Sequence, residues 1–305
     1  MSIVVSLPSD ELFQALSGLP GITPVRWDLE EPPPRKDLDL VVPPYLSKPP
    51  ALRALEQVGR CVVQSQSIGY DGVSQALPEG FTFCNAASVH ETSTAELAVG
   101  LIIAAQRELP GFVLAAQQGE WRGGTTRSLA DSQVLVIGQG GVGRAVTSRL
   151  APFEVTLVRV ASKSRTDADG EVVHGVDELP QLLPEADVVV LAVPLGPGTT
   201  GLVDEAFLAA LKPGALLVNV ARGPVVNTDA LVAALSEGRI RAALDVTDPE
   251  PLPAGHPLWK LDNVLITPHV GGNTTAMTPR VTALVRAQAE ALRDGKPLRN
   301  IVIEP

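Results

Sequence analysis

Short apolar runs recur along the chain and are separated by turn residues or by longer amphipathic stretches. In the first third they occupy residues 3–7, 38–42, 61–64 and 81–84. Short apolar runs bounded by turn signals are typical of buried strands, and their alternation with helical patterns indicates βα units. Proline-rich turns at residues 32–34, 43–44 and 49–50 divide this part into short elements.

The second half repeats this rhythm. Its apolar runs lie at residues 134–137, 155–160, 188–193, 216–220, 242–246 and 264–266. Residues 92–118 between the two sets follow a helical pattern, in which Pro110 and Gly111 predict a break. In a later helix, Thr228 is the predicted N-cap and Gly238 the predicted end. A last helix is predicted over residues 275–293. Strands alternating with helices predict α/β domains with doubly wound parallel sheets.

Composition fits this fold class. With 305 residues, the chain is long enough for two α/β domains. Apolar residues make up 45% of it and aromatic residues only 4%, so the cores are built mainly from aliphatic side chains. This composition favours parallel sheets covered by helices.

Charge, cysteines and histidines exclude several classes of protein. A net charge of −10 argues against binding to nucleic acid or to an anionic membrane. Cys61 and Cys84 lack ligand spacing and are expected to be reduced, and the N-terminus lacks the pattern of a signal peptide, so we expect a cytoplasmic protein. No histidine pair has metal-ligand spacing, which predicts no metal site. His90 is expected at the surface, with a place beside a substrate cleft as the alternative.

A glycine-rich turn follows the apolar run at residues 134–137. Gly138, Gly140 and Gly143 have the spacing with which a tight strand-to-helix turn lets the backbone approach a pyrophosphate at a helix N-terminus. The motif alone is a weak signal, and an ordinary glycine turn is the alternative. The preceding strand and the following helical pattern strengthen the prediction of a dinucleotide site.

The residues expected at the end of the next strand bear on the choice of cofactor. Dinucleotide sites for NAD carry an acidic residue there, which binds the ribose 2′-hydroxyl. In this chain Arg159 is placed at that end and is followed by Ser162 and Lys163. A guanidinium can pair with a 2′-phosphate, so the sequence favours NADP, with NAD as the alternative. An exposed basic loop without a role is the other interpretation.

Arg222, Glu250 and His269 appear in this order near the predicted strand ends of the second half. Ligands bind at these ends in open α/β sheets. The planar cation of Arg222 suits the carboxylate of a 2-keto acid. His269 can donate a proton to the carbonyl oxygen as hydride reaches the carbon, and Glu250 can orient the imidazole and keep it protonated.

At these motifs the chain resembles the D-isomer-specific 2-hydroxyacid dehydrogenases along essentially its full length. The motifs that carry the resemblance lie at residues 136–143, 212–226, 243–252, 257–259 and 263–272. The resemblance implies a Rossmann cofactor domain, residues 94–275, inserted in a flavodoxin-like substrate domain formed by residues 1–93 and 276–305. It also implies a homodimer, which we expect to form through the helices after Thr92.

The resemblance further implies contacts with each ligand. The substrate carboxylate would bind backbone amides in the loop at residues 67–71, with Ser67, Ile68 and Gly69 as the expected contacts. Cofactor contacts are expected at Thr94, Gly138, Gln139, Gly140, Gly141, Val142, Gly143, Arg159, Ser162, Val193, Pro194, Val220, Ala221, Arg222, Asp245, His269 and Gly271. Asp245 is expected to contact the nicotinamide amide. The alternative interpretation is that Asp245 is a structural acid at the end of a strand.

Thr247 departs from the family, which usually has an aromatic residue at this position. The expected activity is reduction of a small 2-keto acid, such as glyoxylate or hydroxypyruvate, to the D-2-hydroxy acid. A dinucleotide-sensing scaffold of the corepressor type and a formate or phosphite dehydrogenase are the alternatives. The chain carries no feature that demands a peptide-binding cleft, and the residues that choose the substrate lie in loops that sequence alone does not place.

Overall fold

The computed structural model describes residues 2–168 and 170–305. The chain divides into two compact units, Met1–His90 with Thr274–Pro305, and Glu91–Asn273. The second unit is therefore an insertion in the first. The chain crosses between the units after His90 and after Asn273, where the sequence placed the crossings after residues 93 and 275.

The first unit has a six-stranded sheet in the order β14-β5-β4-β3-β1-β2, in which β14 is antiparallel to β5 and the other pairs are parallel. Its strands are β1 (Ile3–Leu7), β2 (Ile22–Arg26), β3 (Leu40–Val41), β4 (Val62–Gln64), β5 (Thr82–Cys84) and β14 (Ile301–Ile303). Alternate strand residues face two cores. Helices α1 (Asp10–Leu16) and α9 (Met277–Arg293) cover one face, while the 3₁₀ segment η1 (Pro49–Gln57) and α2 (Val73–Ala76) cover the other.

Four strands predicted in this unit are confirmed, and two strands, β2 and β14, were missed. Both missed strands lie at the edges of the sheet. Strand β2 is only partly buried, and β14 is apolar but has just three residues, which are too few to show a strand pattern. Pro24 within β2 is tolerated there because an edge strand needs fewer ladder hydrogen bonds.

Among the residues described, the sheet of the second unit has eight strands in the order β13-β12-β11-β10-β6-β7-β9-β8, and only β8 pairs antiparallel. The strands are β6 (Gln133–Ile137), β7 (Thr156–Ala161), β8 (Arg165–Thr166), β9 (Val172–Gly175), β10 (Val188–Leu191), β11 (Leu216–Asn219), β12 (Arg241–Leu244) and β13 (Val264–Ile266). The six predicted strands are confirmed. The missed strands β8 and β9 are short and only partly buried, so they carry little apolar signal.

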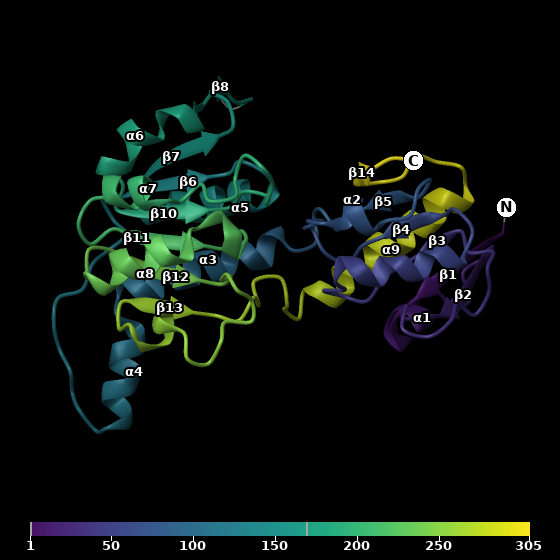
Figure 1. The fold of residues 1–305 in the computed structure, drawn as a ribbon, viewed down its shortest axis with the longest axis horizontal. Helices are drawn as coiled ribbons and strands as arrows, with labels where there is room; N and C mark the ends of the chain where they lie inside the picture. The colour runs from purple at the N-terminus through teal and green to yellow at the C-terminus, as the bar shows by residue number, and fades with distance from the viewer. Residues whose placement is uncertain (1, 169) are drawn as a thin grey trace. The chain divides into compact units, whose positions relative to one another are not determined.

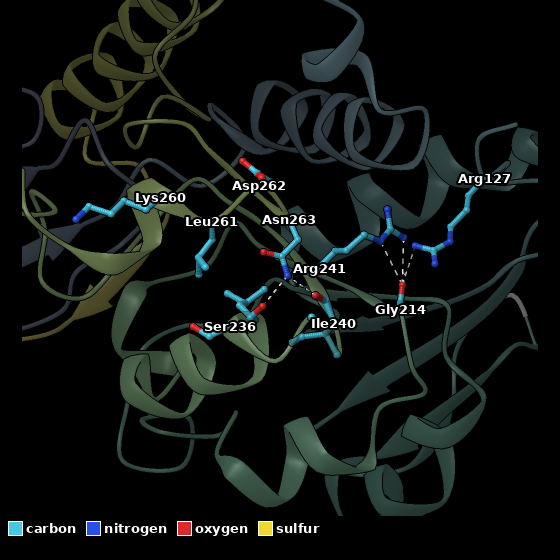
Figure 2. Close-up of a pocket in the computed structure, with 11 residues that line it drawn as sticks. Arg127, Gly214, Ser236, Ile240, Arg241, Lys260, Leu261, Asp262 and Asn263 are labelled. Atoms are coloured by element: carbon cyan, nitrogen blue, oxygen red, sulfur yellow. Dashed lines mark hydrogen bonds between the residues drawn. The ribbon is translucent and has the colours of Figure 1, made fainter. Parts of the chain in front are cut away.

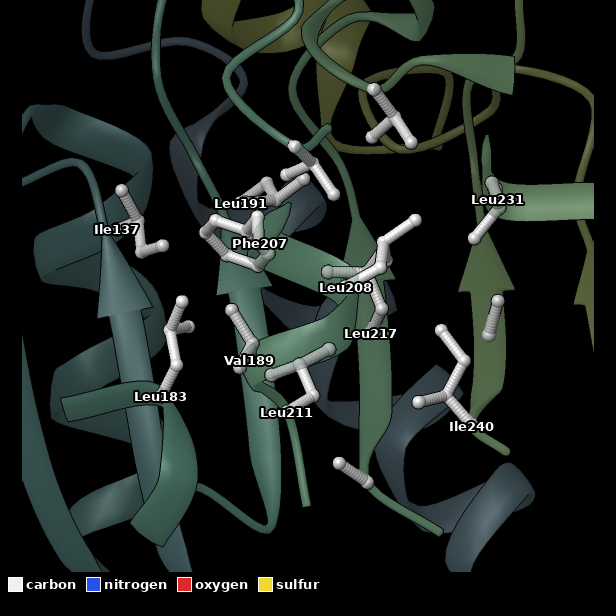
Figure 3. Close-up of a cluster of buried hydrophobic side chains, with 14 of the residues drawn as sticks. Ile137, Leu183, Val189, Leu191, Phe207, Leu208, Leu211, Leu217, Leu231 and Ile240 are labelled. Atoms are coloured by element: carbon white, nitrogen blue, oxygen red, sulfur yellow. The ribbon is translucent and has the colours of Figure 1, made fainter. Parts of the chain in front are cut away.

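Helices cover both faces of this sheet (Figure 1). On one face lie α3 (Glu91–Gln106) and α5 (Gly141–Leu150), and on the other lie α6 (Leu179–Leu182), α7 (Glu205–Ala210) and α8 (Thr228–Ser236). Figure 3 shows part of the second core, where Val189, Leu191 and Leu217 point from neighbouring strands toward Phe207 and Leu208 of α7. The doubly wound α/β fold predicted from the sequence is confirmed.

Two predicted helix boundaries were wrong. The break near Pro110 falls earlier, at Arg107 and Glu108, because proline fits the first turn of α4 (Leu109–Gln117). The N-cap of α8 is Asn227 and not Thr228, since the Asn227 side chain accepts a hydrogen bond from the amide of Ala230 at 3.0 Å.

Within the described residues, no single helix is long and apolar enough to cross a membrane. Helices α3 and α4 are long and apolar enough only when taken together, and they are bent by 65° at the break between them.

Candidate active site

The glycine-rich turn joins β6 to α5. Gly138 has φ of +104°, and a side chain there would overlap the carbonyl of Ala192. A Cβ on Gly143 would overlap the carbonyl of Gly138, so both glycines are required by the fold itself. At Gly140 a Cβ would meet nothing within 4 Å. Gly140 is also the N-cap of α5 and supplies no side-chain cap, so this helix end fits the pyrophosphate of a dinucleotide.

Other predicted cofactor contacts lie at the same end of the sheet as the glycine turn, where the parallel strands finish. The sheet pairs five neighbouring strands in parallel: β6, β10, β11, β12 and β13. The residues that follow these strands therefore lie at one end of the sheet, its carboxyl-terminal end. Val193 and Pro194 follow β10, and Val220 follows β11. Thr94 and Asp245 come together at Gly271, where a Cβ would lie 3.3 Å from Thr94 Cγ2 and 2.9 Å from Asp245 Oδ2. The structure thus places these residues around one end of the sheet.

The prediction that Arg159 ends its strand was wrong by two residues. Strand β7 continues to Ala161, and the Arg159 guanidinium is 3.1 Å from Asp167 and 3.8 Å from Glu171. Ser162 and Lys163 follow the strand end and are exposed. The strand runs on because Arg159, Val160 and Ala161 pair with residues 173–175 of β9, which the sequence pattern did not reveal.

Arg222 is held in place by the turn after β11. Buried Asn219 accepts a hydrogen bond from the amide of Ala221 and donates one to the carbonyl of Arg222, both at 3.0 Å. Gly223 packs so closely against the carbonyl of Thr247 that a side chain would overlap it. Sequence reasoning did not single out Asn219, although one amide in an apolar run is a usable signal, because a buried polar group needs partners.

Glu250 and His269 form the central contact of the site. His269 Nδ1 lies 2.5 Å from Glu250 Oε1. The backbone of His269 is in the left-handed region, with φ of +53°, and its amide donates to the carbonyl of Asp245 at 2.8 Å. The Asp245 carboxylate accepts hydrogen bonds from Thr267 Oγ1 and from the amides of Val270 and Gly271. Asp245 therefore anchors the loop that carries His269, as its structural alternative predicts.

The charges around Glu250 favour its ionised form. Burial raises the pKa of Glu250, but the hydrogen bond from His269, the charge of His269 and the charge of Arg222 lower it, and the net pKa lies below the ordinary value. Arg222 and His269 therefore each lie within electrostatic reach of Glu250. An ionised Glu250 accepts a hydrogen bond from the N–H at His269 Nδ1, which leaves Nε2 as the ring nitrogen that can exchange a proton with a substrate.

In the first unit, the loop after β4 turns its carbonyls inward. The carbonyl of Ser67 accepts from the amide of Ala86 at 2.9 Å, and that of Ile68 accepts from Asn85 Nδ2 at 2.8 Å. Within the part of the chain that the structure describes, no protein atom accepts a hydrogen bond from the amides of Ile68 and Gly69. Adjacent free amides of this kind suit a carboxylate.

The expectation of a surface position for His90 was wrong. Its side chain is only 5% exposed, and its ring stacks on Tyr45. The segment between β5 and α3 carries His90 into the core because Val89 beside it is buried as well. His90 Nε2 lies 2.6 Å from the carbonyl oxygen of Gln66, next to the loop expected to bind the substrate, and its alternative place beside a substrate cleft stays a prediction.

A pocket of about 470 Å³ lies at the opposite end of the large sheet, where strand β12 begins (Figure 2). Arg127 and Arg241 both donate to the carbonyl of Gly214 there. Burial, together with the charge of Arg127, lowers the pKa of Arg241 to about 10. Arg241 also binds the carbonyl of Ala105 and the side chain of Gln106, so it fixes the end of α3. This pocket is separate from the glycine turn and from His269.

Two features lie at the carboxyl-terminal end of the large sheet: a glycine turn at a helix N-terminus and a histidine paired with a carboxylate. Together they define the class of protein, a nicotinamide-dependent oxidoreductase. A model of the family described as D-isomer specific 2-hydroxyacid dehydrogenase, NAD binding domain, matches residues 99–271. The human glyoxylate reductase/hydroxypyruvate reductase is 33% identical over 290 residues, which cover 90% of this chain and 88% of that protein.

Solved structures agree over the full length. A D-isomer specific 2-hydroxyacid dehydrogenase from Xanthobacter autotrophicus, in complex with NADPH, is 28% identical with a TM-score of 0.79 and covers 99% of this chain and 98% of that one. An NADPH-dependent glyoxylate/hydroxypyruvate reductase from Sinorhizobium meliloti, in complex with NADP and malonate, is 25% identical with a TM-score of 0.82 and covers 99% and 97%.

The chain belongs to the D-isomer-specific 2-hydroxyacid dehydrogenase family. It is an NAD(P)-dependent oxidoreductase that transfers a hydride between the nicotinamide cofactor and a 2-keto or 2-hydroxy acid.

Proposed function

We propose that this protein reduces a small 2-keto acid with NADPH, either glyoxylate to glycolate or hydroxypyruvate to the D-2-hydroxy acid. The observation that carries the proposal is the 2.5 Å contact between His269 Nδ1 and Glu250 Oε1, with Arg222 in electrostatic reach. The inserted unit, residues 91–273, is the proposed cofactor domain, and the remainder is the substrate domain.

The roles of the residues follow from their chemistry. Arg222 binds the substrate carboxylate with its planar cation and orients the carbonyl. His269 donates a proton to the carbonyl oxygen through the ring nitrogen that Glu250 does not bind. In the other unit, the amides of Ile68 and Gly69 are proposed as substrate contacts because they have no acceptor among the described residues of that unit. The amides around Gly140 would hold the pyrophosphate of a bound dinucleotide, whose nicotinamide would supply the hydride.

The relatives support the substrate class. The human relative is named a glyoxylate and hydroxypyruvate reductase, and the relative of known structure from Sinorhizobium meliloti carries the same activity in its name. Both substrates are small 2-keto acids with one carboxylate, which matches a single Arg222.

A panel of keto acids assayed with NADPH and NADH tests the proposal. We expect the highest kcat/KM for glyoxylate or hydroxypyruvate with NADPH. Activity confined to formate or phosphite would replace the proposed substrate with that of a formate or phosphite dehydrogenase. Dinucleotide binding without turnover of any acid in the panel would favour a sensing scaffold.

The preference for NADP rests on the residues after β7. Ser162 and Lys163 stand where a site for NAD has an acidic residue, and both are exposed. Arg159 is engaged by Asp167 at 3.1 Å, so Lys163 is the better-placed partner for a 2′-phosphate. The charge-assisted contacts of Lys163 are each worth about 1.5–3 kcal/mol.

Replacing Lys163 with aspartate is expected to lower the NADPH to NADH ratio of kcat/KM by about 10- to 100-fold, because attraction becomes repulsion. Steady-state kinetics with both cofactors measure the ratio. Lys260 is exposed and lies beside the pocket at the opposite end of the large sheet. Lys260→Asp makes the same charge change there and should leave the ratio of kcat/KM values unchanged. Equal use of both cofactors by the unmodified enzyme would restore NAD as the cofactor.

We also propose a homodimer that forms through α4 and the segment after it. Leu109, Val113 and Leu114 are 44–59% exposed, and Trp121 is fully exposed. In Figure 1, α4 and the following segment extend away from the sheet of their own unit. Grouped exposed apolar side chains of this kind mark association surfaces.

A cytoplasmic location remains a prediction that rests on the two free thiols of Cys61 and Cys84.

The variant Val113→Asp/Leu114→Asp is expected to be monomeric, because it places two charges in the proposed interface. Sedimentation velocity gives the mass in solution. Val172→Asp changes an equally exposed valine, 60% exposed, on β9 and should leave the dimer intact. A dimer in all variants would show that α4 is not the interface, and a monomeric unmodified protein would exclude the dimer.

A further inference from the structure

We propose that His90 is a positioning residue for the substrate loop: its imidazole N–H fixes the carbonyl of Gln66 and thereby keeps the amides of Ile68 and Gly69 available to the keto-acid carboxylate. The inference rests on the proposed function, which gives this loop its ligand. His90 does not touch the substrate in this proposal.

The geometry of His90 defines its bond. Nε2 lies 2.6 Å from the carbonyl oxygen of Gln66, and the side chain is 5% exposed. A carbonyl oxygen only accepts, so Nε2 carries a hydrogen in either charge state of the ring. The ring also stacks on Tyr45, with centroids 5.5 Å apart and planes inclined by 22°. The stacking orients the ring and aims its N–H at the carbonyl.

Gln66 is held at a second point. Its side-chain amide donates to the carbonyl of Pro43 at 2.7 Å, and the residue is 7% exposed. Pro43 and Tyr45 belong to the segment after β3, Gln66 to the loop after β4, and His90 to the segment after β5. These strands are parallel neighbours, so the three segments meet at one edge of the small sheet.

The bond at Gln66 decides how the loop faces. The next amide, that of Ser67, donates to Ser65 Oγ at 3.0 Å. A rotation of the peptide between Gln66 and Ser67 would break both bonds and move the amides that follow. A carbonyl turned toward the ligand would repel a carboxylate, whereas an amide attracts it. Neighbouring carbonyls of the loop bind Ala86, Asn85 and Gln64, so only the Gln66 carbonyl depends on His90.

A histidine that merely fills the core would behave differently. Phenylalanine keeps the ring and the stacking on Tyr45 but cannot donate a hydrogen bond. Glutamine loses the ring but can place an N–H near the position of Nε2. If packing were the whole role, phenylalanine would be the better replacement; if the donor matters, glutamine would be.

The experiment compares His90→Phe with His90→Gln in the full-length enzyme. We expect His90→Phe to raise KM for the keto acid about tenfold or more, because a small displacement of binding groups is costly, and to leave the Kd of NADPH unchanged. His90→Gln should retain KM within about threefold of the unmodified value. Hydrogen exchange of the Ser67 amide, which donates to Ser65 Oγ, should accelerate in His90→Phe only. His174→Phe removes a histidine of the inserted unit and is the matched control.

The outcomes separate the two proposals. An unchanged KM and unchanged exchange in His90→Phe overturn the positioning role, as does a glutamine variant that is as impaired as the phenylalanine variant. If the unmodified enzyme reduces no keto acid, the proposed function fails, and the exchange measurement alone then decides whether His90 holds the loop. An unchanged far-UV circular dichroism spectrum and thermal unfolding midpoint confirm that the unit containing His90 is folded in each variant, because NADPH binding reports only on the inserted unit.

Discussion

Replacing His269 with alanine is expected to lower kcat for keto-acid reduction by about 10²- to 10⁴-fold, the usual contribution of a general acid. The imidazole is held by Glu250 at 2.5 Å and by a backbone that Asp245 anchors. Alanine removes the proton donor and leaves this scaffold in place. Binding of NADPH should be nearly unchanged, because the phosphates bind at the glycine turn and not at the imidazole.

Stopped-flow kinetics and a fluorescence titration with NADPH measure the two quantities separately. His256→Ala is the matched control, because His256 caps a short 3₁₀ segment in the same unit and has no proposed role in proton transfer. A His269→Ala enzyme with near-normal kcat would remove His269 from the mechanism. Loss of NADPH binding in the variant would assign the residue to the cofactor site instead.

Arg222→Lys is expected to reduce kcat/KM for the keto acid by about 10- to 100-fold, since an ammonium group cannot grip both carboxylate oxygens in one plane. The turn that carries Arg222 is fixed by Asn219 and by the tight packing of Gly223, so the lysine variant should keep the backbone geometry. Steady-state kinetics with a keto acid and with an aldehyde of similar size provide the test.

For the aldehyde, which has no carboxylate, activity should be low in the unmodified enzyme and change little in the variant. Arg286→Lys on the exposed face of α9, where Arg286 pairs with Glu290, should have no effect on either substrate. If the unmodified enzyme reduced the aldehyde as well as the keto acid, the role assigned to Arg222 would be wrong.

Local sequence was sufficient for the central strands and the glycine turn. A central strand of a parallel sheet is buried on both faces, so β6 and β10 appear as continuous apolar runs. The positive φ of Gly138 and the close packing at Gly143 leave no alternative to glycine, and for this reason the turn has a readable motif. Strands β2, β8, β9 and β14 lack such a signal, because each is short, only partly buried, or both.

The identities of the proposed catalytic residues could also be predicted, but their contacts could not. Arg222, Glu250 and His269 are chemically unusual at the ends of apolar strands, and their order along the chain suggested one site. Their proximity depends on the order β11-β12-β13 in the sheet, which brings the strand ends together. The role of Asp245 in anchoring the His269 loop depends on the same order.

The sequence by itself therefore determined the α/β class, the glycine turn and the chemical groups of the site, because these follow from side-chain size, polarity and backbone freedom at single positions. Only the tertiary structure decided which groups meet. It paired Arg159 of β7 with Asp167, which follows β8, and it buried His90 against Tyr45 and Gln66. Such contacts join residues whose separation in the chain carries no periodic signal, so they depend on how strands align and on which side chains face inward.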